Sequence, residues 1–575
     1  MTDRRIGVYV CYCGGNISDY VDVEKVRDVI SSEPEVVVAK TTMFTCSDAS
    51  QEEIIEDIKA NKLDGLVVAS CSPKLHLFTF RAMAERAGLN PYQYVQVNLR
   101  EQDSWVHQHD MEGATEKGIR LVRAGIAKCA LTEPLTTMRI ETTPKILIVG
   151  AGVAGLRAAL SLSDMGFAIF VVERESIIGG WAGKIGSMFP NNRKGSDLIN
   201  KLHDEAKKRD NITIFMDAEL VEKSGSVGDF SVVVRVKEKE NISLNIGSII
   251  VATGFEPYQP AEGEFDYGQD SIITLPDFKQ LLDSSNGDLL YKGRSIKDIA
   301  YIYCVGSRQP QELENANLYC SRYCCTAAIH TSLEVFKKDK RIHQFHLYRD
   351  MRTYGKYELL YNDALDDGSL FIKFSEDNPP SVKRNGNKVI IRVQDLLTNR
   401  EEFDIEVDML VLVTGMVPKK NENLVSTLKL PIGIDGFFNE IHPKLRPVET
   451  VIDGVFIAGA CQSPKTLAES VTSSLAAASK SAALLMKGYV DLEPLIAKID
   501  IDRCVWCDEC SKVCPYEAIE KTLIDGKEVA RIISALCKGG GACVPVCPQD
   551  AIDIEGYTDV QITSMIDSLI KEINR

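Results

Sequence analysis

The segment 145–175 constrains the fold of this chain more than any other stretch. It reads KILIVGAGVAGLRAALSLSDMGFAIFVVERE: an apolar strand, a glycine turn, a helix and a second strand ending in an acidic residue. In the pattern G-x-G-x-x-G, Gly150 makes the tight turn, Gly152 lets the backbone approach a pyrophosphate, and Gly155 lets helix and strand pack closely. Glu173 stands where a carboxylate binds a ribose 2′-hydroxyl. The segment predicts a Rossmann-type dinucleotide-binding unit.

Three further motifs point to one dinucleotide. IIGGWAG contains Gly179, Gly180 and Trp181, VATGFEP contains Gly254, and GVFIAGA contains Gly459. All three resemble the FAD-contacting motifs of thioredoxin-reductase-like flavoproteins. The resemblance therefore implies FAD as a cofactor.

The likeness to those flavoproteins has two departures. They usually carry an acidic residue after the Ala-Gly of GVFIAGA, where this chain has Ala460. They also carry a second glycine loop for NADPH, whereas the equivalent strand here reads IAYIYCVGSRQP, which disfavours a self-contained NAD(P)H-dependent reductase.

Lys465 follows the last of these motifs, GVFIAGA, and has two possible interpretations. Either it brings positive charge to the isoalloxazine and stabilises a reduced, anionic flavin, or it is a surface lysine.

The C-terminal cysteines predict ferredoxin-type clusters. CVWCDECSKVCP has C-x2-C-x2-C-x3-C-P spacing, in which three thiolates wrap one cubane and the fourth reaches the other cluster. A second copy of the motif, CKGGGACVPVCP, has Gly540 in place of the second cysteine. The pairing rule assigns one complete 4Fe–4S cluster to Cys504, Cys507, Cys510 and Cys547. It leaves three ligands for the other site: Cys514, Cys537 and Cys543. That site is a three-iron cluster, a cubane with a non-cysteine ligand, or empty; zinc knuckles are the alternative for the whole unit.

A third group of cysteines lies mid-chain. It consists of Cys304 in IAYIYCVGSRQP and of Cys320, Cys324 and Cys325 in LYCSRYCCTA. If SRYCCTAAIHTSLEVF begins a helix, Cys320 and Cys324 share one face and Cys325 lies about 100° round. Such a group is compatible with an iron–sulfur cluster, a dithiol redox centre or packed core thiols. Adjacent cysteines rarely suit tetrahedral zinc.

A fourth group belongs to the N-terminal segment, which alternates strand-like and helix-like stretches and so predicts a parallel sheet. Cys11, Cys13, Cys46 and Cys71 each follow an apolar run interpreted as a strand. Because the carboxyl ends of parallel strands meet at one edge, these cysteines are predicted to converge and bind a cluster. The alternative is that they are buried thiols.

The predicted fold class is α/β, in several domains: an N-terminal parallel-sheet domain, a Rossmann-type FAD domain like that of thioredoxin reductase, a second α/β domain interrupting it, and a two-cluster ferredoxin-like domain. The predicted N-terminal domain is 1–138, and the FAD domain consists of 145–257 and 406–490. The interrupting domain is 258–405, and it lacks the glycine loop that would bind NADPH. The ferredoxin domain is 495–557, and a helical tail follows at 558–575.

Composition excludes several classes of protein. A net charge of −16 argues against a nucleic-acid-binding surface. The N-terminus lacks the features of an export signal, and no run reaches the roughly 18 apolar residues of a membrane span, so a cytoplasmic protein is expected. In a reducing compartment, 17 cysteines point to metal binding or redox chemistry rather than to structural disulfides.

Nearly end to end, the chain resembles the A-type subunit of heterodisulfide reductase, the flavin-containing component of that enzyme in methanogens and some anaerobic bacteria. The motifs that carry the resemblance are IGVYVCYCGGNI, ASCSPKLH, IVGAGVAGL, YCSRYCC, GACQSPK and the terminal ferredoxin unit. The resemblance implies a non-standard 4Fe–4S cluster near FAD, held by Cys304, Cys320, Cys324 and Cys325. Some members carry a ferredoxin insert in the flavin domain. No cysteine motif for it occurs here, which predicts a short form.

The resemblance also implies flavin-based electron bifurcation. A hydrogenase or formate dehydrogenase partner supplies an electron pair, which FAD divides between a disulfide-reducing partner and ferredoxin. The disulfide chemistry lies on a partner protein, and the family pattern implies a homodimer. Three alternatives stay open: a plain flavin–iron–sulfur relay as in quinone-interacting oxidoreductases, a scaffold with a structural flavin, and a dithiol reductase using Cys324 and Cys325.

Overall fold

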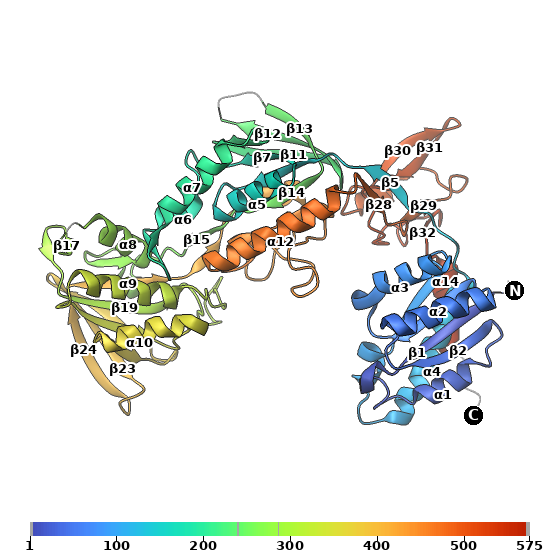
Figure 1. The fold of residues 1–575 in the computed structure, drawn as a ribbon, viewed down its shortest axis with the longest axis horizontal. Helices are drawn as coiled ribbons and strands as arrows, with labels where there is room; N and C mark the ends of the chain where they lie inside the picture. Colours follow the sequence, from blue (N-terminus) through green and yellow to red (C-terminus); the bar gives the residue numbers. More distant parts are fainter. Residues whose placement is uncertain (1–3, 238–240, 286, 571–575) are drawn as a thin grey trace. The chain divides into compact units, whose positions relative to one another are not determined.

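The computed structural model describes residues 4–237, 241–285 and 287–570 (Figure 1). The chain divides into two compact units, one of Met1–Arg139 with Asp491–Arg575 and one of Ile140–Val490. The first and last segments of the chain therefore belong to one unit.

The N-terminal segment is a three-layer α/β structure. Its parallel sheet has the order β2-β1-β3-β4, with β1 at Ile6–Cys11, β2 at Val36–Thr42, β3 at Gly65–Ser70 and β4 at Tyr94–Asn98. Its helices are α1 Val23–Ile30, α2 Asp48–Asn61, α3 Pro73–Ala87 and α4 Met111–Ala130. Along β1, Val8 packs with α1 and α4 whereas Tyr9 packs with α2 and α3, because successive side chains of a strand point to opposite faces. The expected parallel sheet is confirmed.

The C-terminal part of the same unit consists of short strands and loops. Its elements are β29 Ala497–Ile499, α13 Glu509–Lys512, β30 Ile519–Ile524, β31 Lys527–Ile532, β32 Ile552–Ile554 and α14 Asp559–Ile570. The strands form two antiparallel pairs, β29 with β32 and β30 with β31. Gln561 on α14 donates a hydrogen bond to the Leu131 carbonyl (2.9 Å), and Lys128 Nζ lies 3.1 Å from the centre of the Tyr557 ring. These contacts attach the last helix to the end of α4.

The second unit contains a parallel sheet built from both sides of a long interruption. Its order is β10-β7-β6-β14-β27, with β6 at Lys145–Val149, β7 at Ala168–Val172, β10 at Ile212–Phe215, β14 at Ser248–Val251 and β27 at Val455–Ile457. The helices α5 Val153–Asp164, α7 Gly195–Lys207 and α12 Leu467–Leu485 contribute to its core. An antiparallel sheet follows, of β11 Ala218–Ser226, β12 Asp229–Val236 and β13 Asn241–Ile246.

The interrupting segment forms a second parallel sheet, entered and left through the antiparallel pair β15 Phe255–Pro257 and β26 Met416–Pro418. Its order is β16-β25-β19-β20-β21, with β16 at Ile272–Thr274, β19 at Asp298–Val305, β20 at His343–Tyr348, β21 at Leu370–Lys373 and β25 at Met409–Thr414. One face packs on helices, namely α8 Leu275–Ser284 and α9 Cys324–Lys338. The other packs on an antiparallel sheet, of β22 Ser381–Asn385, β23 Lys388–Asp395 and β24 Glu401–Val407. Helix α10 is Glu358–Asp366.

The remaining elements are short. They are β5 Met138–Glu141, α6 Gly180–Lys184, β8 Ser187–Met188, β9 Arg193–Lys194, β17 Leu290–Tyr291, β18 Arg294–Ser295, α11 Glu422–Leu428 and β28 Tyr489–Leu492. Among the helices of the described residues, none combines the length and the apolar character that crossing a membrane requires.

Candidate functional site

The glycine loop between β6 and α5 needs two of its glycines for backbone reasons. Gly150 has a φ of +111°, and a Cβ there would lie 2.4 Å from the Ala252 carbonyl oxygen. A Cβ on Gly155 would lie 1.9 Å from the carbonyl oxygen of Gly150. Gly152 is different, because a Cβ at that position meets nothing within 4 Å. The middle glycine therefore borders open space, where a pyrophosphate would approach the backbone.

This open space is a cavity of about 800 Å³, within the range of cofactor pockets. The motif residues that line it come from both sides of the interruption: Gly150, Gly152, Glu173, Gly179, Gly180, Trp181, Gly254 and Lys465. Gly459 does not line the cavity but lies behind its wall. Its φ is +76°, and a Cβ there would come 2.9 Å from the Ala154 Cβ. A glycine turn at a helix start, an open approach and a cavity of this size fit FAD.

Glu173 holds the glycine turn in place as well as lining the cavity. Its carboxylate accepts hydrogen bonds from the backbone N–H groups of Ala151 (2.7 Å) and Glu175 (3.0 Å). A carboxylate offers about four lone-pair sites, so acceptor capacity remains for a ribose hydroxyl. On another part of the wall, Trp181 Nε1 donates to Glu256 Oε2 (3.0 Å), which fixes the indole ring.

Lys465 lies in the cavity wall just before α12. Its Nζ donates to Gln462 Oε1 and to Ser463 Oγ, both at 3.0 Å. Burial lowers the pKa of Lys465 from its ordinary value, and the nearby Cys461 thiol opposes that shift. The neighbouring Ala460 also lines the cavity, whereas Cys461 is buried and donates to the carbonyls of Val251 (3.3 Å) and Ala458 (3.2 Å).

The four mid-chain cysteines approach one another at the end of β19 and the start of α9. Cys304 has a φ of +64° near the end of its strand. A hydrogen bond to Cys325 raises the pKa of Cys324, and burial and the thiols of Cys304 and Cys320 raise it further. Burial and Cys325 likewise raise the pKa of Cys304, while Arg349 lowers it. The structure thus brings the four residues into one group.

The condition for a shared helix face in this group is not met. A shared face for Cys320 and Cys324 required a helix beginning at Ser321, but α9 begins at Cys324. Arg322 has a φ of +62°, outside the helical region, so Cys320 lies in the preceding loop. Cys320 and Cys324 therefore do not share a helix face.

The cysteine group adjoins the cavity. Tyr323 and Ala327 line the cavity, and Tyr323 directly precedes the paired cysteines. Arg322 forms an ion pair with Glu469 (2.5 Å), in the first turn of α12, so the cysteine loop is tied to the helix that follows Lys465. The dinucleotide cavity and the thiol group are neighbouring features of one unit.

The C-terminal cysteines separate into two sets. A small cavity is lined by Cys504, Cys507, Cys510 and Cys547, together with Trp506, Ile552 and others. Backbone N–H groups donate to the sulfur atoms of two of these cysteines, Ala530 to Cys504 (3.3 Å) and Ala551 to Cys547 (3.2 Å). Hydrogen bonds to sulfur are one means by which proteins set the potential of a cluster.

The second set has three cysteines. Burial raises the pKa of Cys543, and the proximity of Cys537 and Cys514 contributes to the rise. The backbone N–H of Ala497 donates to Cys537 Sγ and that of Ala518 to Cys514 Sγ, both at 3.4 Å. The same pattern of N–H to sulfur bonds therefore surrounds both sets.

The N-terminal cysteines lie at the carboxyl edge of the parallel sheet. Burial raises the pKa of Cys71 to about 11, and Cys13 and Cys11 are close enough to raise it too. Burial also raises the pKa of Cys46, again with contributions from Cys11 and Cys13. The strand ends thus bring together residues separated by up to 60 positions.

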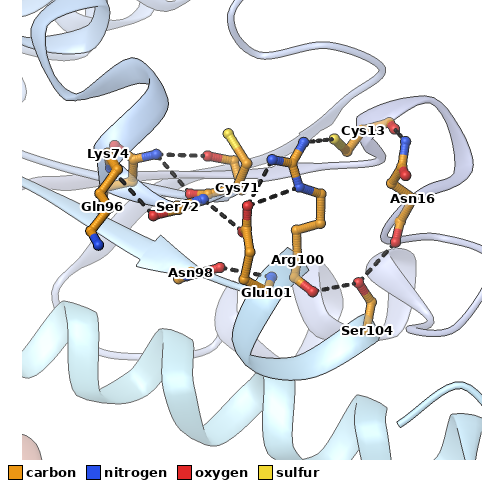
Figure 2. A network of polar contacts seen from close by, with 11 residues as sticks. Cys13, Asn16, Cys71, Ser72, Lys74, Gln96, Asn98, Arg100, Glu101 and Ser104 are labelled. Carbon is orange, nitrogen blue, oxygen red and sulfur yellow. Dashed lines mark hydrogen bonds and ion pairs between the residues drawn. The ribbon is translucent and has the colours of Figure 1, made fainter. Parts of the chain in front are cut away.

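Arg100 and Glu101 connect two of these cysteine loops (Figure 2). Arg100 Nη1 donates to Cys13 Sγ (3.5 Å), and its Nη2 donates to Glu101 Oε1 (2.7 Å). The other Glu101 oxygen accepts the backbone N–H of Ser72 (2.8 Å), next to Cys71. The guanidinium also lies over the Trp105 ring, 4.8 Å from its centre. A fixed positive charge therefore lies beside the N-terminal thiols.

Comparison with known proteins agrees with these two kinds of site. Residues 144–320 match the family model described as pyridine nucleotide-disulphide oxidoreductase, and residues 497–554 match a 4Fe-4S dicluster domain. These matches imply FAD and 4Fe–4S clusters. They confirm the expected fold class and show that the protein is an oxidoreductase.

Relatives cover nearly the whole chain. The second A-type iron-sulfur subunit of the CoB–CoM heterodisulfide reductase of Methanopyrus kandleri is 35% identical over 613 residues, covering 92% of each chain. The chain belongs to the family of A-type heterodisulfide reductase subunits. The A-type component of the H(2):CoB-CoM heterodisulfide,ferredoxin reductase of Methanothermobacter thermautotrophicus is also 35% identical, over 90% of this chain and 91% of the relative.

The Methanopyrus relative has residues without a counterpart in this member of the heterodisulfide reductase family. The alignment to the Methanopyrus protein extends over 613 positions, more than the 575 residues of this chain, so the relative carries additional residues.

Among solved structures, a thioredoxin reductase from T. acidophilum is similar to this chain. It has 19% identity and a TM-score of 0.40, and the match covers 60% of this chain and 99% of the thioredoxin reductase.

The cysteine groups of this heterodisulfide reductase family member can be compared with the geometry of a single-metal site. In the described part of the chain, no three Cys, His, Asp or Glu side chains are arranged to hold a single metal ion. A tetrahedral zinc site would need its thiolates about 2.3 Å from one point, whereas each cysteine of a 4Fe–4S cubane binds a different iron.

Sequence reasoning missed several residues around these sites. Lys419 and Lys420 line the cavity. The only sign of this in the sequence was that two lysines stand next to each other directly after β26. Arg100 had no motif to mark it. It follows β4 in the chain, as the cysteines follow their strands, and that position was the only clue.

A substitution of Arg100 tests its electrostatic role. If the N-terminal cysteines hold a cluster, Arg100→Gln should lower its reduction potential by on the order of 100 mV, the effect of one charge about 7 Å away at an effective dielectric near 20. Arg100→Lys keeps the charge and should shift the potential less. An EPR-monitored titration of the intact complex measures both. An unchanged potential in Arg100→Gln, with iron content intact, would contradict the role.

Proposed function

We propose that this chain is the FAD and iron–sulfur electron-transfer subunit of a heterodisulfide reductase-type complex, in which electron pairs are divided between a disulfide-reducing partner and ferredoxin. One observation carries the proposal: the cavity that fits FAD adjoins the group of four thiols at the start of α9, joined through Tyr323. A two-electron carrier beside a one-electron carrier is the arrangement that electron-pair splitting needs.

The cluster ligands form part of the proposal. We assign a cluster near FAD to Cys304, Cys320, Cys324 and Cys325, and a complete ferredoxin cluster to Cys504, Cys507, Cys510 and Cys547. A further cluster is assigned to Cys11, Cys13, Cys46 and Cys71. The mutual proximity of the thiols within each set supports these assignments.

FAD, when bound, supplies chemistry in steps of one or two electrons, and the protein tunes its environment. Lys465 is the residue proposed to do so. Its ammonium group in the cavity wall favours added negative charge, which stabilises the reduced flavin.

The partners follow from the names of relatives. The Methanothermobacter relative is named for hydrogen, the CoB–CoM heterodisulfide and ferredoxin, and that of Methanococcus maripaludis for hydrogen or formate. By analogy, a hydrogenase or formate dehydrogenase-type protein supplies electrons here, and ferredoxin and a disulfide-reducing protein accept them. A homodimer of this chain is the assembly that we propose.

An anaerobic redox titration of the intact complex tests the splitting of electron pairs. Bifurcation requires the first one-electron potential of the flavin to lie below the second, so optical spectra should show direct two-electron reduction and EPR should show almost no flavin radical. A flavin radical that accumulates over a wide range of potential would contradict bifurcation. That result would leave the simpler function of a flavin–iron–sulfur relay.

A further inference from the structure

The second ferredoxin site departs from the two-cluster pattern of its domain. Two 4Fe–4S clusters need eight cysteine ligands. Residues 497–554 match the dicluster model, but this segment contains seven cysteines, and Gly540 occupies the eighth position. One corner of the second cluster therefore lacks its cysteine.

The backbone does not require glycine at this position. Gly539 has a φ of +63°, and a Cβ there would lie 2.3 Å from the Leu495 carbonyl oxygen. Gly541 also has a positive φ, of +73°. Gly540 lies outside this left-handed region, and a Cβ on it would make only an ordinary contact, 3.8 Å from Tyr516 Cε2. Gly539 and Gly541 adopt the left-handed backbone conformations of the turn, whereas the position between them has room for a side chain.

The space directly beside Gly540 is not filled by another ligand. Among the described residues, leaving out Gly540 and its two chain neighbours, the Tyr516 ring carbon is the only heavy atom found within 4 Å of the position of a Cβ on Gly540. A carboxylate or imidazole is absent from that space. The three cysteines of the site nevertheless belong to one core, since Cys543 is buried in it and Cys514 and Cys537 pack against it.

We propose that Cys514, Cys537 and Cys543 hold a three-iron cluster, 3Fe–4S, whose open corner faces Gly540. This corner takes up a thiophilic divalent cation such as Fe²⁺. In the reduced state the cluster core is neutral, so addition of Fe²⁺ gives a 4Fe–4S core of charge +2 with no electron transferred. Water completes the coordination of the added metal. The proposal is independent of electron bifurcation, because it concerns only this set of ligands.

The test compares the wild-type complex with Gly540→Cys, prepared anaerobically with all subunits. EPR of the mildly oxidised wild-type protein should show a three-iron signal of about one spin per chain, because an oxidised 3Fe–4S cluster is paramagnetic and an oxidised 4Fe–4S cluster of charge +2 is not. In Gly540→Cys this signal should fall at least tenfold. Gly540→Ala is the matched control, since it adds the Cβ without the thiolate and should keep the signal.

Metal exchange supplies a second measurement. Reduction with added Fe²⁺, followed by mild reoxidation, should give wild-type protein without the three-iron signal, whereas the same cycle without added Fe²⁺ should return it. Treatment of the iron-loaded protein with a chelator and then with oxidant should restore the signal. Gly540→Cys should not respond to either treatment. The FAD content and the signals of the other clusters show whether each variant has folded.

Two results would overturn the proposal. A wild-type protein without a three-iron signal, whose iron resists the chelator, would mean that another ligand completes a four-iron cluster. If the wild type also lacks the iron of the second site, the three cysteines bind no cluster. Neither result would affect the titration of the flavin, so the two proposals fail separately.

Discussion

Gly152→Ala is expected to give a folded protein that is purified with little or no flavin. At this position φ is −75° and ψ is −176°, which alanine adopts readily, and a Cβ would meet no protein atom within 4 Å. The added methyl group would occupy the space through which the backbone approaches the pyrophosphate. Losing charge-assisted hydrogen bonds to the phosphates should weaken FAD binding by roughly 100-fold or more, or about 3 kcal/mol.

Two measurements check this result: flavin absorbance per chain and thermal unfolding of the protein freed of flavin. Gly155→Ala is the informative comparison, because its Cβ would collide with the Gly150 carbonyl oxygen at 1.9 Å. That variant should lose stability as well as flavin. If Gly152→Ala retained flavin at the wild-type stoichiometry, the dinucleotide would lie elsewhere in the cavity.

Cys304→Ser is expected to remove the cluster proposed beside the flavin while FAD remains bound. Cys304 contributes a thiol from the end of β19, and the other three thiols lie on or just before α9. A serine hydroxyl is a poor substitute for a thiolate toward iron, so about four irons per chain should be lost. Electron transfer between flavin and partner proteins should fall by at least about 100-fold, since the relay is interrupted.

Iron and sulfide analysis, EPR and flavin content measure these effects. Cys129→Ser is the matched control. Cys129 is a fully buried thiol in α4 that bonds to the carbonyls of Leu66 and Gln93, and it belongs to none of the four cysteine groups. Its substitution should leave the iron content unchanged. If Cys304→Ser kept the iron content and EPR spectra of the wild type, the assignment of this ligand set would be wrong.

Much of the fold could be predicted because its signals are local. The backbone demands of Gly150 and Gly155 arise within one turn between a strand and a helix, so the G-x-G-x-x-G pattern was enough to place them. The parallel N-terminal sheet followed from alternating apolar and amphipathic stretches. The convergence of Cys11, Cys46 and Cys71 needed only the rule that parallel strands end at one edge.

Other features required contacts between distant segments. The start of α9 depends on the left-handed backbone conformation of Arg322. The residues SRYCC include no glycine or asparagine that would have predicted such a turn. Whether Lys465 lies in a wall or on the surface depended on how α12 packs beside β6 and β14. Arg100 reaches Cys13 across 87 positions of sequence, and its charge there is a property of the folded sheet edge.

The amino-acid sequence alone indicated a dinucleotide and iron–sulfur clusters, because glycine turns and cysteine spacings are short patterns set by covalent geometry, and FAD in particular followed from the resemblance of three further motifs to those of flavoproteins. It also determined that one ferredoxin ligand is missing at Gly540. Only the tertiary structure decided that the flavin cavity adjoins the mid-chain thiols and that, among the described residues, no ligating side chain fills the space directly beside Gly540. Both depend on side chains brought together by the packing of strands and helices far apart in the chain, and no local pattern encodes such distances.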